Sequence, residues 1–240
     1  TATPFARNSI FSGLLPNDLK NKYPDIWKKM FYENKLNGYE EQLMNNLLIE
    51  NGMKENSHKY IKISDLKAGN KLVNKINDYK NFNILSIVVN FVDILGHSRA
   101  ESKVLSELIP NDSAYRKAIL NWFSNSWLLE VINIIKTWEK ANIVITSDHG
   151  NTNVGRPIMV KGDQMTSSGI RYKYGRNLRV DTKYTMKIDK PEEYNLPKFD
   201  VNTEYIIAKD KGYFVYSNEY HKYVNIYKDT FQHGGISMDE

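Results

Sequence analysis

The stretch GNKLVNKINDYKNFNILSIVVNFVDILGH, residues 69–97, decides the fold class of this chain. Its first half has the apolar spacing of an amphipathic helix, and the mostly apolar run 84–92 is typical of a strand covered on both faces. We expect this strand to end near Asp93. A helix that leads directly into a buried strand is the repeating unit of an α/β sheet.

The same order of helix and strand recurs along the chain. Apolar positions three and four apart predict one long helix over residues 113–140, and NIVITSDHG at 142–150 is a second apolar strand candidate. Earlier, residues 37–53 predict an amphipathic helix that ends at Gly52, IKISDL at 61–66 a short strand, and residues 16–27 a turn and loop. The sequence therefore predicts an α/β fold with a mostly parallel sheet and helices on both faces.

The composition of the chain changes after Val160. Residues 161–230 are rich in Tyr, Thr, Lys and Arg and show alternating rather than helical patterns, so we expect a β-rich insertion or cap. The α/β core then spans residues 1–160, and residues 231–240 return to it. The basic residues of the insertion suit phosphates, and its tyrosines suit stacked bases, but a solvated sheet edge explains them equally well. These basic residues are Lys161, Arg171, Lys173, Arg176, Arg179, Lys183 and Lys187.

Composition excludes several kinds of site. The 240 residues include no cysteine, which excludes disulfides, thiolate metal sites and a cysteine nucleophile, and which fits a reducing cytoplasm. Metal sites built from Asp, His and hydroxyl groups remain open. No apolar run approaches the length of a membrane span, so we expect no membrane association. A net charge of +5 suits an anionic ligand but is common in lysine-rich chains.

Acids and histidines follow both apolar strand candidates. Asp93 precedes His97 by four residues, and Asp148 directly precedes His149. Ligands of open parallel sheets bind beyond the carboxyl ends of the strands, which is where both pairs are expected. His233 precedes two glycines that allow close backbone approach. Taken singly, each motif is also explained by a capped loop or a structural turn.

The stretch TATPFARNSIFSG at residues 1–13 predicts a helix from about Pro4 to Ser12, with Thr3 just before it and Gly13 as its left-handed C-cap. Thr3 is then either an N-cap or a nucleophile beside the free N–H groups and positive end of the helix. Together with the acids and histidines, this hydroxyl makes a ligand set that suits two neighbouring divalent cations of the zinc or manganese kind.

The order of TATPFARNSIFSGLLP, VDILGH, SDHG and HGG resembles the alkaline phosphatase superfamily, and most of all the PglZ domain of PorX-type response regulators. The resemblance implies that Thr3 is the catalytic nucleophile. It also implies two divalent metal ions, with Zn²⁺ as the expected metal. Asp93, His97 and His233 would hold one, and Asp148, His149 and the Thr3 oxygen would hold the other.

The resemblance further implies a phosphoric ester hydrolase. We expect a zinc-dependent phosphodiesterase that cleaves short linear or cyclic oligonucleotides through a phospho-threonine intermediate, with Arg7 and Asn8 on nonbridging phosphate oxygens. There are two alternatives. One is a signalling module that binds a regulator and in which the zinc site is structural. The other is a phosphomonoesterase or phosphomutase.

The cellular role is also implied only by the resemblance. PorX-type proteins place this domain at the output of a two-component system that controls type IX secretion. A sensor histidine kinase, an extracytoplasmic-function sigma factor and a homodimer are then the expected partners. The superfamily takes one more aspartate ligand from a strand upstream of the nucleophile, so we expect the chain to be part of a longer protein.

Overall fold

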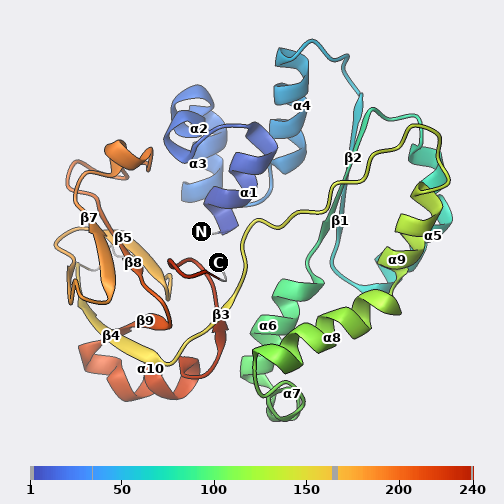
Figure 1. Cartoon of the computed structure of the whole chain (residues 1–240). Coiled ribbons are helices and arrows are strands. Elements are labelled where there is room, and N and C mark those ends of the chain that lie inside the picture. Colours follow the sequence, from blue (N-terminus) through green and yellow to red (C-terminus); the bar gives the residue numbers. More distant parts are fainter. Residues whose placement is uncertain (1–2, 34, 164–166, 239) are drawn as a thin grey trace. The chain divides into compact units, whose positions relative to one another are not determined.

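The computed structural model describes residues 3–33, 35–163, 167–238 and 240, with only the backbone at Thr3 (Figure 1). The chain forms two units. Unit 1 consists of Thr1–Leu43 and Ser147–Glu240, and unit 2 consists of Met44–Thr146. The chain has α/β architecture, as predicted, and its sheets are mixed. None of the described helices is both long and apolar enough to cross a bilayer.

Unit 2 is built around a parallel strand pair. Strand β1 (His58–Ile63) pairs with β2 (Ile84–Val89) in the register His58↔Ile84 to Ile63↔Val89. The connection between them contains α5 (Leu66–Lys75) and the short 3₁₀ helix η1 (Ile76–Tyr79). Asp65 starts α5 by accepting a hydrogen bond of 2.8 Å from the Ala68 N–H. The unit therefore contains the strand, helix and parallel strand that the sequence predicts.

Helices α5 and α9 (Trp127–Ile135) cover these strands, and their apolar faces form the core of unit 2 (Figure 1). A Cβ atom added at Gly69 would lie 2.3 Å from the Trp127 indole. Position 69 thus admits only glycine in this packing. The buried members of the core are Ile63, Leu72, Ile76, Trp127 and Val131.

The predicted strand 84–92 is shorter than expected. β2 ends at Val89, and Asn90 has helical dihedral angles that begin α6 (Phe91–Glu101). Asp93 consequently lies in the first turn of a helix and not at a strand end. An acid there is favoured, because the helix N-terminus carries a partial positive charge.

The predicted helix 113–140 is two helices. α8 (Asp112–Ser124) ends at Asn125, and α9 starts after Ser126, whose backbone is extended and whose Oγ accepts a 3.2 Å hydrogen bond from the Leu128 N–H. Ser126 thus interrupts the helical pattern as an N-cap. The remaining helix of this region is α7 (Lys103–Leu108), which Ser102 caps.

The predicted strand in NIVITSDHG is absent from the described structure. Residues 141–146 adopt extended coil outside every sheet, and Val144 is 86% exposed. An apolar run becomes a strand only when neighbouring strands take up its backbone hydrogen bonds. The predicted second strand is therefore wrong for this structure.

Unit 1 begins with three helices, α1 (Thr3–Ser12), α2 (Pro16–Lys22) and α3 (Pro24–Tyr32). Gly13 ends α1 with a φ of 65°, as predicted. The loop predicted for residues 16–27 is wrong, because each proline occupies the first position of a helix, where its fixed φ helps and its missing N–H costs nothing. The following helix, α4 (Glu40–Glu50), runs from unit 1 into unit 2 and closes at Gly52, φ 82°.

Two three-stranded sheets form the rest of unit 1. In one, β4 (Arg156–Lys161) lies between β9 (Gly212–Tyr216), which is parallel to it, and β6 (Arg179–Val180), which is antiparallel. In the other, β8 (Glu204–Ala208) pairs antiparallel with β5 (Tyr172–Gly175) and β7 (Thr185–Ile188). Apolar side chains from β4, β8 and β9 form one core. Short helices complete the segment: η2 (Pro191–Tyr194), η3 (Ser217–Glu219) and α10 (Tyr220–Tyr227).

Candidate active site

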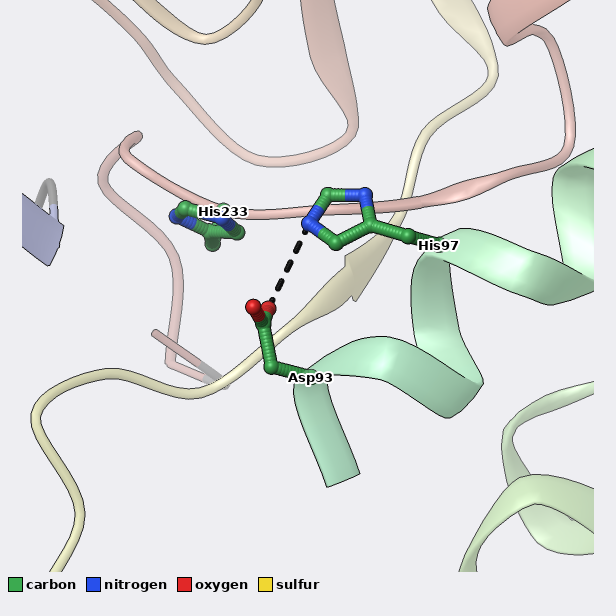
Figure 2. Close-up of side chains that lie close together, drawn as sticks. All are labelled: Asp93, His97 and His233. Carbon is green, nitrogen blue, oxygen red and sulfur yellow. Dashed lines mark ion pairs between the residues drawn. The ribbon is translucent and has the colours of Figure 1, made fainter. Parts of the chain in front are cut away.

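Asp93 and His97 form an ion pair on α6. They are four residues apart on one helix face, and Asp93 Oδ1 lies 3.3 Å from His97 Nε2 (Figure 2). The hydrogen bond and charge of Asp93 raise the pKa of His97, although burial lowers it in part. Both side chains are about half exposed to solvent, and a carboxylate and an imidazole are donors that a divalent cation can use. Figure 2 also labels His233, which belongs to unit 1.

Asp148 and His149 lie side by side in unit 1. Nδ1 of His149 is 3.0 Å from the Gly150 carbonyl oxygen, and because a carbonyl only accepts, we assign the ring proton to Nδ1. The Nε2 lone pair then faces Asp148 Oδ2 at 3.5 Å. This donor set therefore fits a metal such as zinc.

A short strand pair brings His233 to His149. β3 (Thr152–Asn153) begins shortly after His149, and β10 (Phe231–Gln232) ends just before His233. Their antiparallel pairing, with Gln232 opposite Thr152, places the two histidines at the same end of the ladder. The imidazole rings stack with centroids 3.8 Å apart and planes 11° apart. The stacking brings together two imidazoles of unit 1, and imidazole is a common metal ligand.

The helix that carries the predicted nucleophile lies in the same unit. Thr3 is the first residue of α1, and its side chain is outside the described part of the structure. Arg7 pairs with Glu40, with Nη2 to Oε1 at 2.7 Å. Asn8 is fully buried, and its Nδ2 donates to the Pro4 and Leu36 carbonyls at 2.6 and 2.9 Å. A phosphate contact by the Asn8 amide N–H requires one of its two bonds to be exchanged.

The basic residues of the β-rich segment fall into three groups, of which one, Arg176 and Lys187, is half-buried. Arg171 and Lys173 are fully buried, so neither is a surface cation for a phosphate. Lys161, Arg179 and Lys183 are exposed. Arg156, which the sequence analysis did not single out, lies 4.3 Å from the centre of the Tyr184 ring, and Lys183 lies 5.2 Å from it. Sequence offered no way to separate the groups, because burial depends on how the two sheets pack.

A comparison with protein families matches residues 1–240 to the BREX system PglZ alkaline phosphatase-like domain. The chain belongs to the PglZ family. A search of the curated proteins found no match. The PglZ match covers the whole chain, and the alkaline phosphatase-like description indicates a phosphoesterase-type hydrolase. Alkaline phosphatase-like enzymes use divalent metals, and the acids and histidines of this PglZ domain are suitable donors.

Proposed function

We propose that this PglZ domain is a two-metal phosphodiesterase acting on nucleotides, preferentially short linear or cyclic oligonucleotides. The family match supports the phosphoesterase class. The observation that carries the metal-dependent part is the pairing of acids with histidines. Asp93 is paired with His97 on α6, and His149 contacts both Asp148 and His233.

In the proposal, Asp93, His97 and His233 hold one zinc ion. Asp148 and His149, together with the Thr3 oxygen, hold the second. The stacking of His149 on His233 supports two adjacent ions, because the two rings serve different ions in this assignment. Zinc is the favoured metal because imidazole and carboxylate are among its usual protein donors.

When bound, the two cations lower the pKa of a coordinated hydroxyl and stabilise negative charge on phosphate oxygens. Thr3 begins α1, where free backbone N–H groups and the helix dipole favour an anion. Its hydroxyl would give up its proton to water, and its oxygen would bond to phosphorus while the bond from phosphorus to the leaving oxygen breaks. The leaving oxygen would take up a proton from water. Water then cleaves the phospho-threonine, which restores the hydroxyl and releases the phosphate product. Two displacements give net retention at phosphorus.

Substrate contacts in the proposal come from both parts of unit 1. Arg7 and Asn8 are the candidates for the nonbridging oxygens. In the β-rich segment, the exposed Lys183 beside the Tyr184 ring combines a charge for phosphate with an aromatic surface for a base. This combination favours nucleotides over simple phosphate esters.

Turnover assays test the proposal directly. Full-length protein with zinc is incubated with a dinucleotide, a cyclic dinucleotide and mono- and bis-p-nitrophenyl phosphate, beside Thr3→Val and Thr3→Ser. We expect diester cleavage that Thr3→Val abolishes and Thr3→Ser partly retains. Binding of zinc without turnover in any variant would favour a structural metal site in a signalling module. Monoester preference would favour a phosphomonoesterase or phosphomutase.

For the cellular role, we propose the output domain of a PorX-type response regulator in the cytoplasm. A sensor histidine kinase and an extracytoplasmic-function sigma factor are the proposed partners in the control of type IX secretion. The family description instead names the BREX system. Phosphorylation of the full-length protein with acetyl phosphate is expected to change its hydrolysis rate or drive dimerisation. An unchanged rate and an unchanged mass in solution would count against the regulator role.

A further inference from the structure

Arg171 and Glu240 form a bidentate ion pair in the interior of unit 1. Arg171 Nε donates to Glu240 Oε1 at 2.7 Å, and Arg171 Nη2 donates to Oε2 at 2.5 Å. The side chains are 0% and 1% exposed. Burial raises the pKa of Glu240, but the hydrogen bonds from Arg171 and from the Gly235 N–H outweigh it and hold the pKa below its usual value. The pair is therefore ionised.

This pair also contacts the turn that carries His233. Glu240 Oε1 accepts a second hydrogen bond, of 2.9 Å, from the Gly235 N–H. The Arg171 guanidinium occupies the space beside Gly235, where an added Cβ would lie 2.3 Å from Nη2. The preceding Gly234 has a φ of 101°, a conformation that favours glycine. The two glycines thus allow the backbone of the turn to approach the ion pair closely.

The ion pair is anchored on its far side to the sheets. Arg171 Nη1 donates to the Gly212 carbonyl at the start of β9, and the Arg171 carbonyl accepts from Ala208 at the end of β8 at 2.8 Å. Ile236, just after the turn, donates to the Ala208 carbonyl at 2.8 Å. The turn is therefore tied to rigid strands through the guanidinium and through its own backbone.

A buried ion pair contributes little net stability, because desolvation offsets most of the attraction. Its geometric effect is larger, since a guanidinium fork fixes the carboxylate in position and orientation. We propose that Arg171 and Glu240 are positioning residues that hold the His233 turn in the conformation that presents the imidazole to its metal. This inference rests on the proposed function, in which His233 is a ligand.

Two variants test this role against a matched control. Glu240→Gln removes the charge and one acceptor, and Arg171→Lys keeps the charge but loses the fork. Glu204→Gln is the control, because Glu204 also accepts a backbone N–H, from Leu178 at 3.0 Å, and pairs with Lys187, but lies on β8 away from the turn. The readouts are the zinc affinity by chelator competition and the hydrogen exchange rate of the Gly235 amide in metal-free protein.

We expect Glu240→Gln and Arg171→Lys to weaken binding of one zinc ion by about 10- to 100-fold, as outer ligand partners typically do. Both variants should also speed exchange at Gly235, and Glu204→Gln should do neither. In a His233→Ala background, Glu240→Gln should cause no further loss of zinc affinity.

Two outcomes would overturn the positioning role. One is that Glu240→Gln matches Glu204→Gln in both readouts. The other is that its effect on zinc affinity persists in the His233→Ala background, which would mean that the pair stabilises the fold generally. If the wild-type protein binds no zinc, the proposed function fails. Fast Gly235 exchange in Glu240→Gln would then still show that the pair holds the turn, and unchanged exchange would refute that as well.

Discussion

Arg7 and Glu40 form a nearly buried ion pair that ties α1 to the start of α4. Arg7 Nη2 lies 2.7 Å from Oε1 and 2.8 Å from Oε2, and the Glu40 side chain is 1% exposed. The pair lies one helical turn from Thr3. The guanidinium therefore positions α1 through a carboxylate that is itself cut off from water.

Removing one charge of this pair should destabilise the protein more than removing both. Arg7→Met leaves an uncompensated buried carboxylate, which typically costs about 3–5 kcal/mol. The double variant with Glu40→Leu should recover most of this loss. Urea denaturation of the two single variants and the double variant measures the coupling. Additive losses would show that the pair is not coupled in the folded protein.

Gly69→Ala should weaken the packing of α5 on α9. The new methyl group would overlap the Trp127 indole, and overpacking of this kind costs roughly 1–3 kcal/mol. Gly155→Ala is the matched control, because an added Cβ there meets nothing within 4 Å. The midpoints of urea denaturation compare the two. Equal midpoints would contradict the packing described for unit 2.

His97→Ala should remove one of two bound zinc ions. Loss of one of three ligands leaves Asp93 and His233 too weak to retain the metal, while the other proposed site stays occupied. Metal analysis after dialysis should fall from two ions per chain to one. His221→Ala, on α10, is the control. Two retained ions in His97→Ala would remove His97 from the ligand set.

Lys173→Met should stabilise the protein at neutral pH. Burial lowers the pKa of Lys173 from 10.5 to about 8, and its described partners are the Ser167 carbonyl at 3.1 Å and the Tyr216 ring. The unfolded chain therefore binds more protons than the folded chain between these two pH values. The penalty for burying the charge is complete below pH 8 and fades as the pH rises toward 10.5.

The stability difference between Lys173→Met and wild type should be on the order of 1–3 kcal/mol at pH 7 and shrink toward pH 10. Tyr172, whose pKa burial raises to about 12, stays neutral over this range and does not mask the effect. Denaturation curves at several pH values measure the difference. A difference that does not change with pH would show that the Lys173 amine titrates normally.

Predictions from local sequence were confirmed where a single residue determines the backbone conformation. Gly13 and Gly52 were predicted to end helices, and both have the positive φ that only glycine adopts freely. The β2 strand was found from its apolar run. Its end was misplaced because apolar periodicity does not distinguish a strand from the first turns of a buried helix.

The site was only partly predictable for a related reason. The spacing of four between Asp93 and His97 is enough to pair them once the segment is helical. The contact of His149 with His233 depends on the pairing of β3 with β10, which joins segments about 80 residues apart and has no local pattern. The role of Arg171 was missed because a basic residue in an alternating segment looks the same whether it is buried or exposed.

The uncovered run Ile143, Val144 and Ile145 has a practical consequence for anyone who handles this domain. These three consecutive side chains are β-branched, uncharged and exposed, and they lie outside any described sheet. Such a segment can pair with the same segment of other copies. Concentrated protein should therefore form oligomers that scatter light, and Val144→Lys should suppress them while leaving the denaturation midpoint unchanged. Crystallisation and zinc titrations alike would gain from that single added charge.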